Sequence, residues 1–442
     1  MTGFNDLPNE IVVELWHQVL PPDDIASFAR VSRRIFALAA PFLKEYHRLK
    51  SKYSVFVNWT SYDGSIFAHL LKDVLLNPHI AFYVKKVCVY DWRSWWVNPA
   101  VGTPYSNPDT DDEKNYVWHV PYPEKDMELF RNGIRKAQYV LPSEVDIWIQ
   151  NLESGDEDPV VTFLLCLLPN LRTLSLGELP FETLLSSTIR RIAENANSTT
   201  FSKLKSIQLA GSVFDQHECM SLVKPFMLLP SVEKISCFNF ENCRRERDIP
   251  DCFIAPQSSN VTELVFDSCG DIVERIPMLL EGIKGLKKFT FVAGCETVDA
   301  FWIRSALPNH CRHSLEYLKM RFEYEPSNYL GSLGLFENLR SLDVQHSSLV
   351  NPDAGDDFTI GNSLPTSIEA IDMTGQQSET VSHIRSCIMG LVSAKGTRLP
   401  NLKRLNYHPV GLLKSKKHFY VDFADMCRLC EGKGFILDFV VS

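Results

Sequence analysis

One arrangement of apolar and polar positions recurs through the last two thirds of the chain. The pattern apolar-x-x-apolar-x-apolar appears nine times from residue 171 onward, as LRTLSL, LKSIQL, VEKISC, VTELVF, LKKFTF, LEYLKM, LRSLDV, IEAIDM and LKRLNY. The first positions of successive copies lie about 29 residues apart on average. Repetition at this period indicates a stack of similar units, each of which adds one strand to a common sheet.

The segments between the copies are long enough to return the chain to the same edge of the sheet. Parallel strands need a connection of about a dozen residues or more, usually a helix. Amphipathic segments meet this need, among them VVTFLLCLL after Asp158-Pro159, FETLLSSTIRRIAENA, DQHECMSLVKPFMLL, ETVDAFWIRSAL, SETVSHIRSCIMGLV and FYVDFADMCRLC. We therefore predict an α/β fold with a curved parallel sheet whose helices lie on its convex side.

Three further segments resemble the nine repeat copies less closely. YVKKVCV (83–89) and EVDIWI (144–149) are interpreted as degenerate copies, and GFILDFVV near the C-terminus as a closing strand. About eleven or twelve strands are expected in all. The array resembles the divergent leucine-rich repeats, with Cys269 at the position where such repeats carry asparagine or cysteine. That resemblance implies a leucine-rich-repeat solenoid over residues 83–442.

The first helix expected from the sequence carries more apolar residues than one buried face requires. LPNEIVVELWHQVLPP has a proline suited to the first helical position and ends in two more, which predicts a helix over residues 8–20. Seven of the ten residues from Ile11 to Leu20 are apolar. A second helix is expected to start at Asp23 or Asp24 and to continue towards Ala39. The surplus apolar surface either packs on the rest of this chain or binds another chain.

The same stretch resembles an F-box, in the form common in fungal proteins, where divergent leucine-rich repeats often follow. The matching positions are LP-x-EI at 7–11, Leu15, LPPDDI at 20–25 and VSRRIFALA at 31–39; Ile35 stands where many F-boxes carry tryptophan. In that family the helical unit docks on the small Skp-type adaptor of SCF (Skp–cullin–F-box) ubiquitin ligases. The resemblance implies an F-box over residues 1–50 and a helical junction over 51–82. It also implies an adaptor surface made of Leu7, Pro8, Ile11, Val12, Leu15, Leu20, Ile25, Val31, Ser32, Ile35 and Leu38.

One long polar segment interrupts the repeats. Residues 101–126, VGTPYSNPDTDDEKNYVWHVPYPEKD, are rich in proline, asparagine and aspartate, which predicts an acidic loop at about 101–123. It is interpreted as a solvated insertion or, alternatively, as a loop that binds a partner. Trp92, Trp95 and Trp96 precede it and are expected to pack in the core or anchor the loop.

Charge and cysteine content narrow the class of partner. The net charge of -9 argues against a general binder of nucleic acid or anionic membranes, whose surface would be basic. There is no room for a secretory signal before Leu7, and the apolar runs are shorter than a membrane span. The twelve cysteines are spread out and are expected to be reduced thiols. These features predict a soluble protein of the cytoplasm, the nucleus or both.

The search for catalytic and metal-binding motifs nominates no enzyme site. Cys427 and Cys430 form an isolated C-x-x-C on an expected helix, and His310, Cys311 and His313 cluster in what Pro308 indicates to be a loop. The sequence contains no Walker loop, G-x-S-x-G or H-E-x-x-H. We expect no metal, no cofactor and no catalytic residue.

The alternating strand residues that point away from the core are expected to face the concave side of the sheet. They form a candidate target-binding surface with Tyr317 as its aromatic anchor, although singly each is also explained as a solvated strand residue. The set is Glu263, Asp267, Lys288, Tyr317, Lys319, Arg321, Asp343 and Gln345.

The two resemblances together lead to an expected function. It is a non-catalytic substrate receptor of an SCF-type ubiquitin ligase, in which the F-box binds the adaptor, and through it a cullin/RING ligase, and the repeats bind a protein target. One alternative is a binding scaffold that acts outside cullin ligases. Another is an enzyme or nucleic-acid-binding protein whose site no motif reveals.

Overall fold

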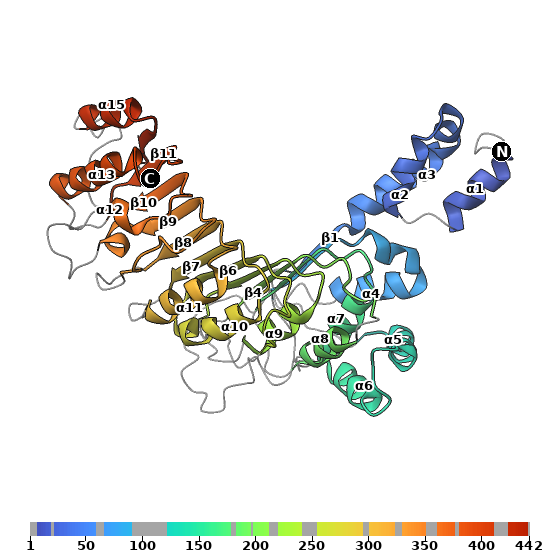
Figure 1. Cartoon of the computed structure of the whole chain (residues 1–442). Coiled ribbons are helices and arrows are strands. Elements are labelled where there is room, and N and C mark those ends of the chain that lie inside the picture. Colours follow the sequence, from blue (N-terminus) through green and yellow to red (C-terminus); the bar gives the residue numbers. More distant parts are fainter. Residues whose placement is uncertain are drawn as a thin grey trace, which may run out of the picture. The chain divides into compact units, whose positions relative to one another are not determined.

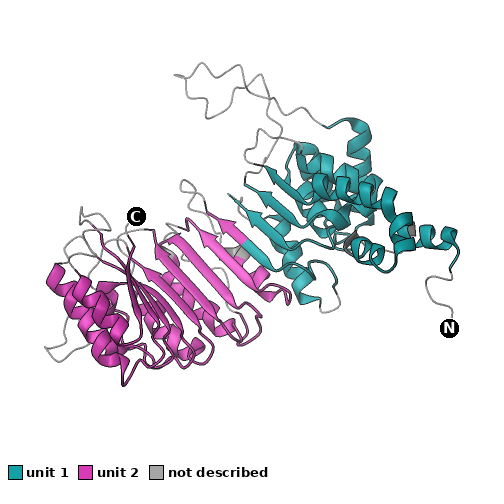
Figure 2. Cartoon of the chain, turned by 90° about the horizontal axis from the view of Figure 1, so that it is seen from above, with its two compact units in different colours: residues 1–207 teal, residues 208–442 magenta. Residues whose placement is uncertain are grey.

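A computed structural model gives the architecture of the chain (Figure 1). It describes residues 7–18, 22–58, 66–90, 122–177, 183–195, 198–211, 220–240, 254–294, 300–322, 329–350, 360–375, 380–410 and 423–440. The predicted acidic loop at 101–123 therefore lies outside the described residues except for its last two positions, and so do Trp92, Trp95 and Trp96. Two compact units divide the chain, Met1–Ile207 and Gln208–Ser442 (Figure 2).

The described residues form one sheet of twelve strands, which lie side by side in the order of the sequence. The neighbouring pairs from β1 to β3 and from β5 to β12 are parallel. The predicted α/β class, parallel sheet and number of strands are confirmed. The strands are β1 (Val55–Asn58), β2 (Lys86–Val89), β3 (Thr173–Leu176), β4 (Ser206–Ala210), β5 (Lys234–Phe238), β6 (Glu263–Cys269), β7 (Lys288–Ala293), β8 (Tyr317–Arg321), β9 (Ser341–Gln345), β10 (Ala370–Thr374), β11 (Arg404–His408) and β12 (Ile436–Phe439).

Helices occupy most of the connections between strands, as the length of the spacers predicts. The segments expected to be helical before and between the repeats are confirmed at α7, α8, α9, α11, α13 and α15. The α-helices are α1 (Asn9–Gln18), α2 (Pro22–Ala29), α3 (Arg33–Tyr53), α4 (Ile66–Leu76), α5 (Glu124–Lys136), α6 (Val145–Ser154), α7 (Asp158–Cys166), α8 (Leu184–Glu194), α9 (Met220–Leu228), α10 (Ile276–Gly282), α11 (Phe301–Cys311), α12 (Ile360–Ser363), α13 (Val381–Lys395) and α15 (Ala424–Gly432). Short 3-10 turns are η3 (Pro78–Tyr83), η5 (Asp271–Arg275) and η6 (His346–Leu349).

In the second unit, the apolar positions of the repeat pattern are the buried positions of the strands. On β6, β7 and β8 the residues at alternate positions, such as Leu264, Phe289 and Leu318, are fully buried. The residues between them are partly exposed. Since successive side chains of a strand point to opposite faces, one face of the sheet packs against the helices and the other faces away from them.

The prediction of a strand at 144–149 is wrong, because this segment belongs to α6. Trp148 and Leu152 lie one helical turn apart, and both are fully buried. Gly155 ends the helix with φ of 96°, a left-handed conformation that suits glycine. The alternating apolar residues of EVDIWI suggested a strand, but the buried positions follow the helical period.

The sheet begins one strand earlier than the repeat pattern indicates. β1 lies within the segment expected to be a helical junction and pairs with β2, with Val55 opposite Lys86. The Asn58 side chain accepts a hydrogen bond of 2.8 Å from the backbone N–H of Tyr90 and so joins the ends of the two strands. β1 has only four residues and one buried position, so its apolar pattern was too short to recognise.

Candidate functional site

The three N-terminal helices share a small apolar core. Val12 on α1, Ile25 on α2 and Ile35 on α3 are at most 5% exposed. The Trp16 ring stacks on Phe42 of α3, with ring centroids 5.6 Å apart and planes 8° from parallel. These helices therefore form one packed unit, and three of the predicted adaptor residues (Val12, Ile25 and Ile35) belong to its core rather than to its surface.

A sharp turn separates α2 from α3, so the expected continuous helix from residue 23 to 39 is wrong. Ser32 has an extended backbone, and its hydroxyl accepts a hydrogen bond of 3.2 Å from the backbone N–H of Ile35. This is the geometry of a helix N-cap. Arg34 then donates to the Leu7 carbonyl at 2.5 Å and to Asn9 Oδ1 at 2.6 Å. The start of α3 thus holds the start of α1 in place.

Several apolar side chains of this unit remain on its surface. Ile11 is 48% exposed, and Val31 and Phe36 are each 57% exposed. Phe36 was missing from the predicted surface, although the apolar pattern of the segment included it. Among the other predicted positions, Pro8 is exposed, Leu7, Leu15, Ser32 and Leu38 are half-buried, and Leu20 lies outside the described residues.

The second candidate surface is the face of β5–β12 that points away from the helices. On β8 and β9 the outward positions include the predicted residues Tyr317, Lys319, Arg321, Asp343 and Gln345. Asp343 accepts two hydrogen bonds from Arg321 at one carboxylate oxygen, from Nε at 3.1 Å and from Nη2 at 2.9 Å. Its other oxygen lies 3.6 Å from Lys319 Nζ. Two cations therefore share a single, largely buried carboxylate.

A second shared carboxylate lies on β6. Glu263 pairs with Lys234 of β5 through one oxygen, and its other oxygen lies 3.8 Å from Lys288 Nζ of β7. Gln345 instead binds the backbone of Phe322, whose N–H it accepts at 3.0 Å. The predicted residues are thus brought together on one face, where several of them already bind one another. The remaining predicted residue, Asp267, is also at an outward position of β6 and accepts a hydrogen bond of 3.3 Å from Ser268.

Tyr317 lies in a partly desolvated setting on this face. Partial burial, followed by the nearby carboxylates of Asp343 and Asp372, raises the pKa of its hydroxyl. Its direct neighbours along the same row of the sheet are Lys288 on β7 and Ser341 on β9. The ring therefore has a small side chain on one side and a lysine on the other.

The same face continues on β10–β12, beyond the residues predicted from the sequence. Asp372 Oδ1 accepts a hydrogen bond of 2.7 Å from Asn406 and lies 3.8 Å from His408 Nε2. Asp438 is the register partner of Asn406 on β12. The same repeat pattern that identified Asp343 could have found these residues, because they occupy the equivalent outward positions.

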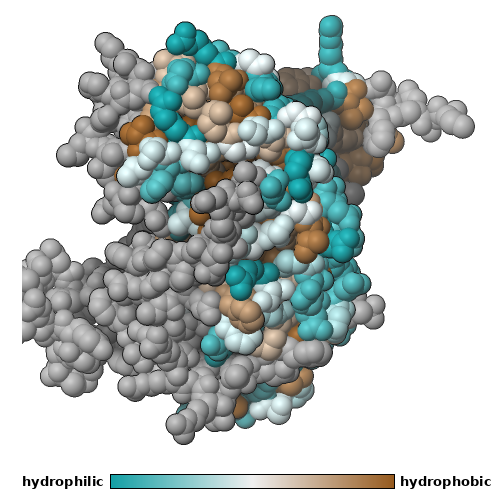
Figure 3. All heavy atoms as spheres, turned by 60° about the vertical axis from the view of Figure 1, so that its left-hand side comes forward, coloured by the Kyte–Doolittle hydropathy of each residue, from teal (hydrophilic) through white to brown (hydrophobic). Residues whose placement is uncertain are grey.

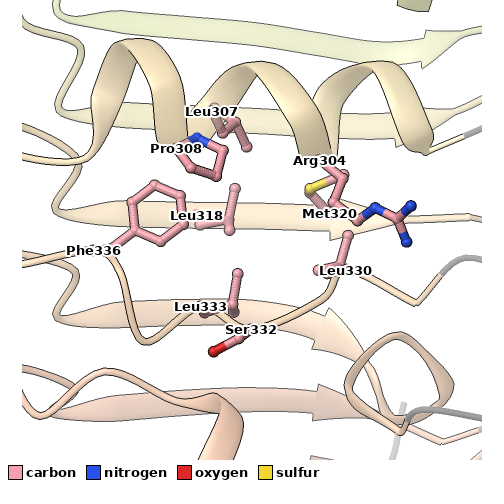
Figure 4. Close-up of a pocket in the computed structure, with 9 residues that line it drawn as sticks. All are labelled: Arg304, Leu307, Pro308, Leu318, Met320, Leu330, Ser332, Leu333 and Phe336. Atoms are coloured by element: carbon pink, nitrogen blue, oxygen red, sulfur yellow. The ribbon is translucent and has the colours of Figure 1, made fainter.

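A small apolar hollow lies between α11, β8 and residues 330–336 (Figure 4). Figure 4 shows Leu307, Leu318, Leu333 and Phe336 pointing toward one another, whereas the guanidinium of Arg304 points away from them. The volume is about 260 Å³, including the part open to solvent. Because much of this volume is open solvent, the enclosed space is far smaller than the roughly 300–1,000 Å³ of a typical ligand pocket. We therefore regard this hollow as a packing gap rather than as a ligand site.

Exposed apolar side chains of the second unit are scattered. Phe301 and Trp302 on α11 form one exposed pair, with ring centroids 5.8 Å apart. On the surface turned forward in Figure 3, hydrophilic and apolar groups are interspersed. Scattered apolar residues are normal on protein surfaces and do not by themselves mark a binding site.

The cysteine and histidine candidates show no reactive geometry. Burial raises the pKa of Cys311 to about 12 and that of Cys430 to about 12, which disfavours their thiolates. The loop predicted around Pro308 is wrong, since α11 continues through this proline to Cys311. His313 Nδ1 lies 2.9 Å from Glu337, so its partner is a carboxylate. Within the described ranges, no group of three potential metal ligands comes together.

No protein-family model matches the chain, and a search of curated proteins finds no match. Across the part of the chain that the structure describes, every helix is too short or too polar to cross a bilayer.

Proposed function

We propose that this chain is the substrate-recognition subunit of an SCF-type ubiquitin ligase. The observation that carries the proposal is the division of apolar residues in α1–α3. Val12, Ile25 and Ile35 are buried in the unit's core, yet Ile11 and Phe36 remain about half exposed. A surface of this kind fits a helical partner such as a Skp-type adaptor, which the resemblance of residues 7–39 to an F-box suggests.

The second half of the proposal assigns the target to the outward face of β5–β12. Solenoid proteins commonly bind partners along such an extended face. In this role the chain needs no catalytic residue, because it acts by holding lysines of the target near a ubiquitin-conjugating enzyme that carries ubiquitin. We place this activity in the cytoplasm or nucleus; the described cysteines, free thiols with Cys88 and Cys237 among them, fit a reducing compartment.

Co-expression with a Skp-type adaptor tests the first half. Ile11→Asp combined with Phe36→Asp should abolish capture of the adaptor, because each change places a charge on a surface that must lose its water. The matched control is Leu76→Asp with Ile147→Asp. These two apolar residues belong to the compact unit Met1–Ile207 but lie outside α1–α3, and they are 65% and 51% exposed. The control should capture the adaptor as the wild type does.

Two results would count against the proposal. Adaptor capture that survives Ile11→Asp with Phe36→Asp would remove the F-box assignment, provided that circular dichroism shows the helices intact. Capture of the adaptor without any cullin, in the same purification, would favour the alternative of a binding scaffold outside cullin ligases.

A further inference from the structure

The outward face of β5–β12 has an uneven distribution of charge. We define the strand-face strip as the charged residues at outward positions of these strands. On β5–β8 it has four cationic residues and two anionic ones, namely Lys234, Lys288, Lys319 and Arg321 against Glu263 and Asp267. On β9–β12 it has three anionic residues and one cationic one, namely Asp343, Asp372 and Asp438 against Arg404.

The ion pairs of the strip reduce this division but do not remove it. Glu263 is shared by Lys234 and Lys288, so the pair of lysines carries one positive charge more than its carboxylate offsets. Asp372 instead has the neutral Asn406 amide as its close partner, at 2.7 Å.

Asp343, at the edge of the acidic half, pairs with Lys319 and Arg321 of the basic half, so these two cations also exceed their shared carboxylate by one charge. When Asp343 is counted with them, the strip keeps one net positive charge on β5–β9 and one net negative charge on β10–β12.

The width of the strip determines the length of a partner segment that can reach both halves. Neighbouring strands lie about 4.8 Å apart, so the strip from β5 to β12 extends about 34 Å across the strands. An extended chain covers about 3.4 Å per residue, which corresponds to about ten residues. A short extended segment is therefore long enough to meet both halves of the strip.

We infer that the strip binds an extended segment of a partner protein that carries acidic residues over β5–β8 and basic residues over β9–β12. The inference rests on the proposed function, for which it specifies the class of target. Charge complementarity of this kind fixes register and suppresses wrong partners more than it adds affinity. A uniformly charged partner, such as a nucleic acid, meets repulsion at one half of the strip.

The test uses two synthetic peptides of about twelve residues with the same composition and no net charge. One carries its glutamates in one half and its lysines in the other, and the second alternates them. Fluorescence anisotropy with the full chain should show about tenfold tighter binding of the block peptide at about 0.01 M salt. The preference should shrink at about 0.15 M salt, where the Debye length falls to about 8 Å.

One double variant removes the charge division without changing the net charge. Lys288→Glu with Asp438→Lys gives each half of the strip equal numbers of positive and negative residues, so the preference for the block peptide should disappear. The matched control, Lys395→Glu with Glu431→Lys, makes the same exchange on α13 and α15 and should keep the preference. Thermal melts of both variants verify that they fold.

Equal binding of the two peptides by the wild type would overturn the inference, as would a preference that survives in the strip variant. Tighter binding of a single-stranded oligothymidylate than of the block peptide would overturn it too. Adaptor capture in the same preparations reports on the proposed function separately, because Lys288 and Asp438 lie outside α1–α3. Normal capture together with equal peptide binding would reject only the strip.

Discussion

Asp343 and Asp372 are register partners on neighbouring strands, β9 and β10, and yet Asp343 has two cations as neighbours whereas Asp372 has an amide and a histidine. Asp343 is bound by the cations Arg321 and Lys319, at 2.9 Å and 3.6 Å. Asp372 accepts a hydrogen bond from the neutral amide of Asn406. Two chemically identical side chains at equivalent positions therefore contribute differently to stability and to the charge of the surface.

Replacing each aspartate by asparagine should separate the two roles. Asp343→Asn should lower the free energy of unfolding by about 2 kcal/mol, because it leaves two partly buried cations without their shared anion. Asp372→Asn should cost less than about 1 kcal/mol, since an amide oxygen can still accept from Asn406. Urea denaturation of the two variants measures the difference. Equal losses would show that the ion pairs of Asp343 contribute little.

A buried carboxylate in the first unit predicts a dependence of stability on pH. Asp158 at the start of α7 is 4% exposed and accepts hydrogen bonds from Thr162 and from the backbone N–H of Leu184. Burial raises the pKa of Asp158 to about 7 from an ordinary value of 3.8, although these hydrogen bonds act in the opposite direction. Between about pH 4 and pH 7 the folded protein thus keeps a proton that the unfolded chain releases.

Stability should therefore fall as pH rises through that window, with Asp158 contributing at most about 4 kcal/mol. Asp158→Asn removes the titrating group, so urea denaturation at the two ends of the window should show a smaller decrease in the variant than in the wild type. Asp146→Asn, the same change at an exposed position of α6, should retain the wild-type decrease. Identical pH dependence in all three proteins would contradict the predicted shift.

A close backbone approach makes one glycine difficult to replace. A Cβ atom added at Gly177, just after β3, would lie 2.5 Å from the carbonyl oxygen of Tyr90 and 2.7 Å from its Cα. Backbone atoms of Tyr90 cannot move aside as the end of a flexible side chain can. Gly177→Ala should therefore lower the free energy of unfolding by about 1–3 kcal/mol. Gly396→Ala is the control, because a Cβ there meets nothing within 4 Å. Urea denaturation that finds the two substitutions equally tolerated would contradict the close approach.

The repeat made most of the fold predictable. Leu264, Leu318 and Leu405 each fill the same buried position of a strand, so one pattern identified many strands at once. The pattern failed where its signal was short or ambiguous. β1 has a single buried residue, and α6 shows local alternation although its buried residues Trp148 and Leu152 follow the helical period.

The candidate surfaces were less predictable, because burial and pairing depend on tertiary contacts. The F-box resemblance placed Ile35 on the adaptor surface and left Phe36 out of it, but packing shows that Ile35 is core and Phe36 is surface. On the strand face, alternation identified Glu263 and Asp343 as outward residues. The ion pairs that each of them makes depend on side-chain conformations across neighbouring strands, which the repeat pattern does not specify.

Ile11 and Val12 give the sharpest test of the division between core and surface in α1. They are adjacent in sequence, yet 48% of Ile11 is exposed and Val12 is fully buried. Val12→Ala should lower the free energy of unfolding of the helical unit by about 2 kcal/mol, because it leaves a cavity in the core of α1–α3 or requires the surrounding side chains to shift. Ile11→Ala should change stability by less than about 0.5 kcal/mol.

Adaptor binding should show the reverse order when it is corrected for the folded fraction. Ile11→Ala should weaken binding about tenfold, since truncation of an interface apolar residue costs about 1–2 kcal/mol. Val12→Ala should leave the affinity of the folded fraction close to that of the wild type. Urea denaturation and adaptor titration on the same samples measure both quantities. If Val12→Ala weakens adaptor binding more than Ile11→Ala while the unit stays folded, the side of α1 assigned to the core would instead be the docking side.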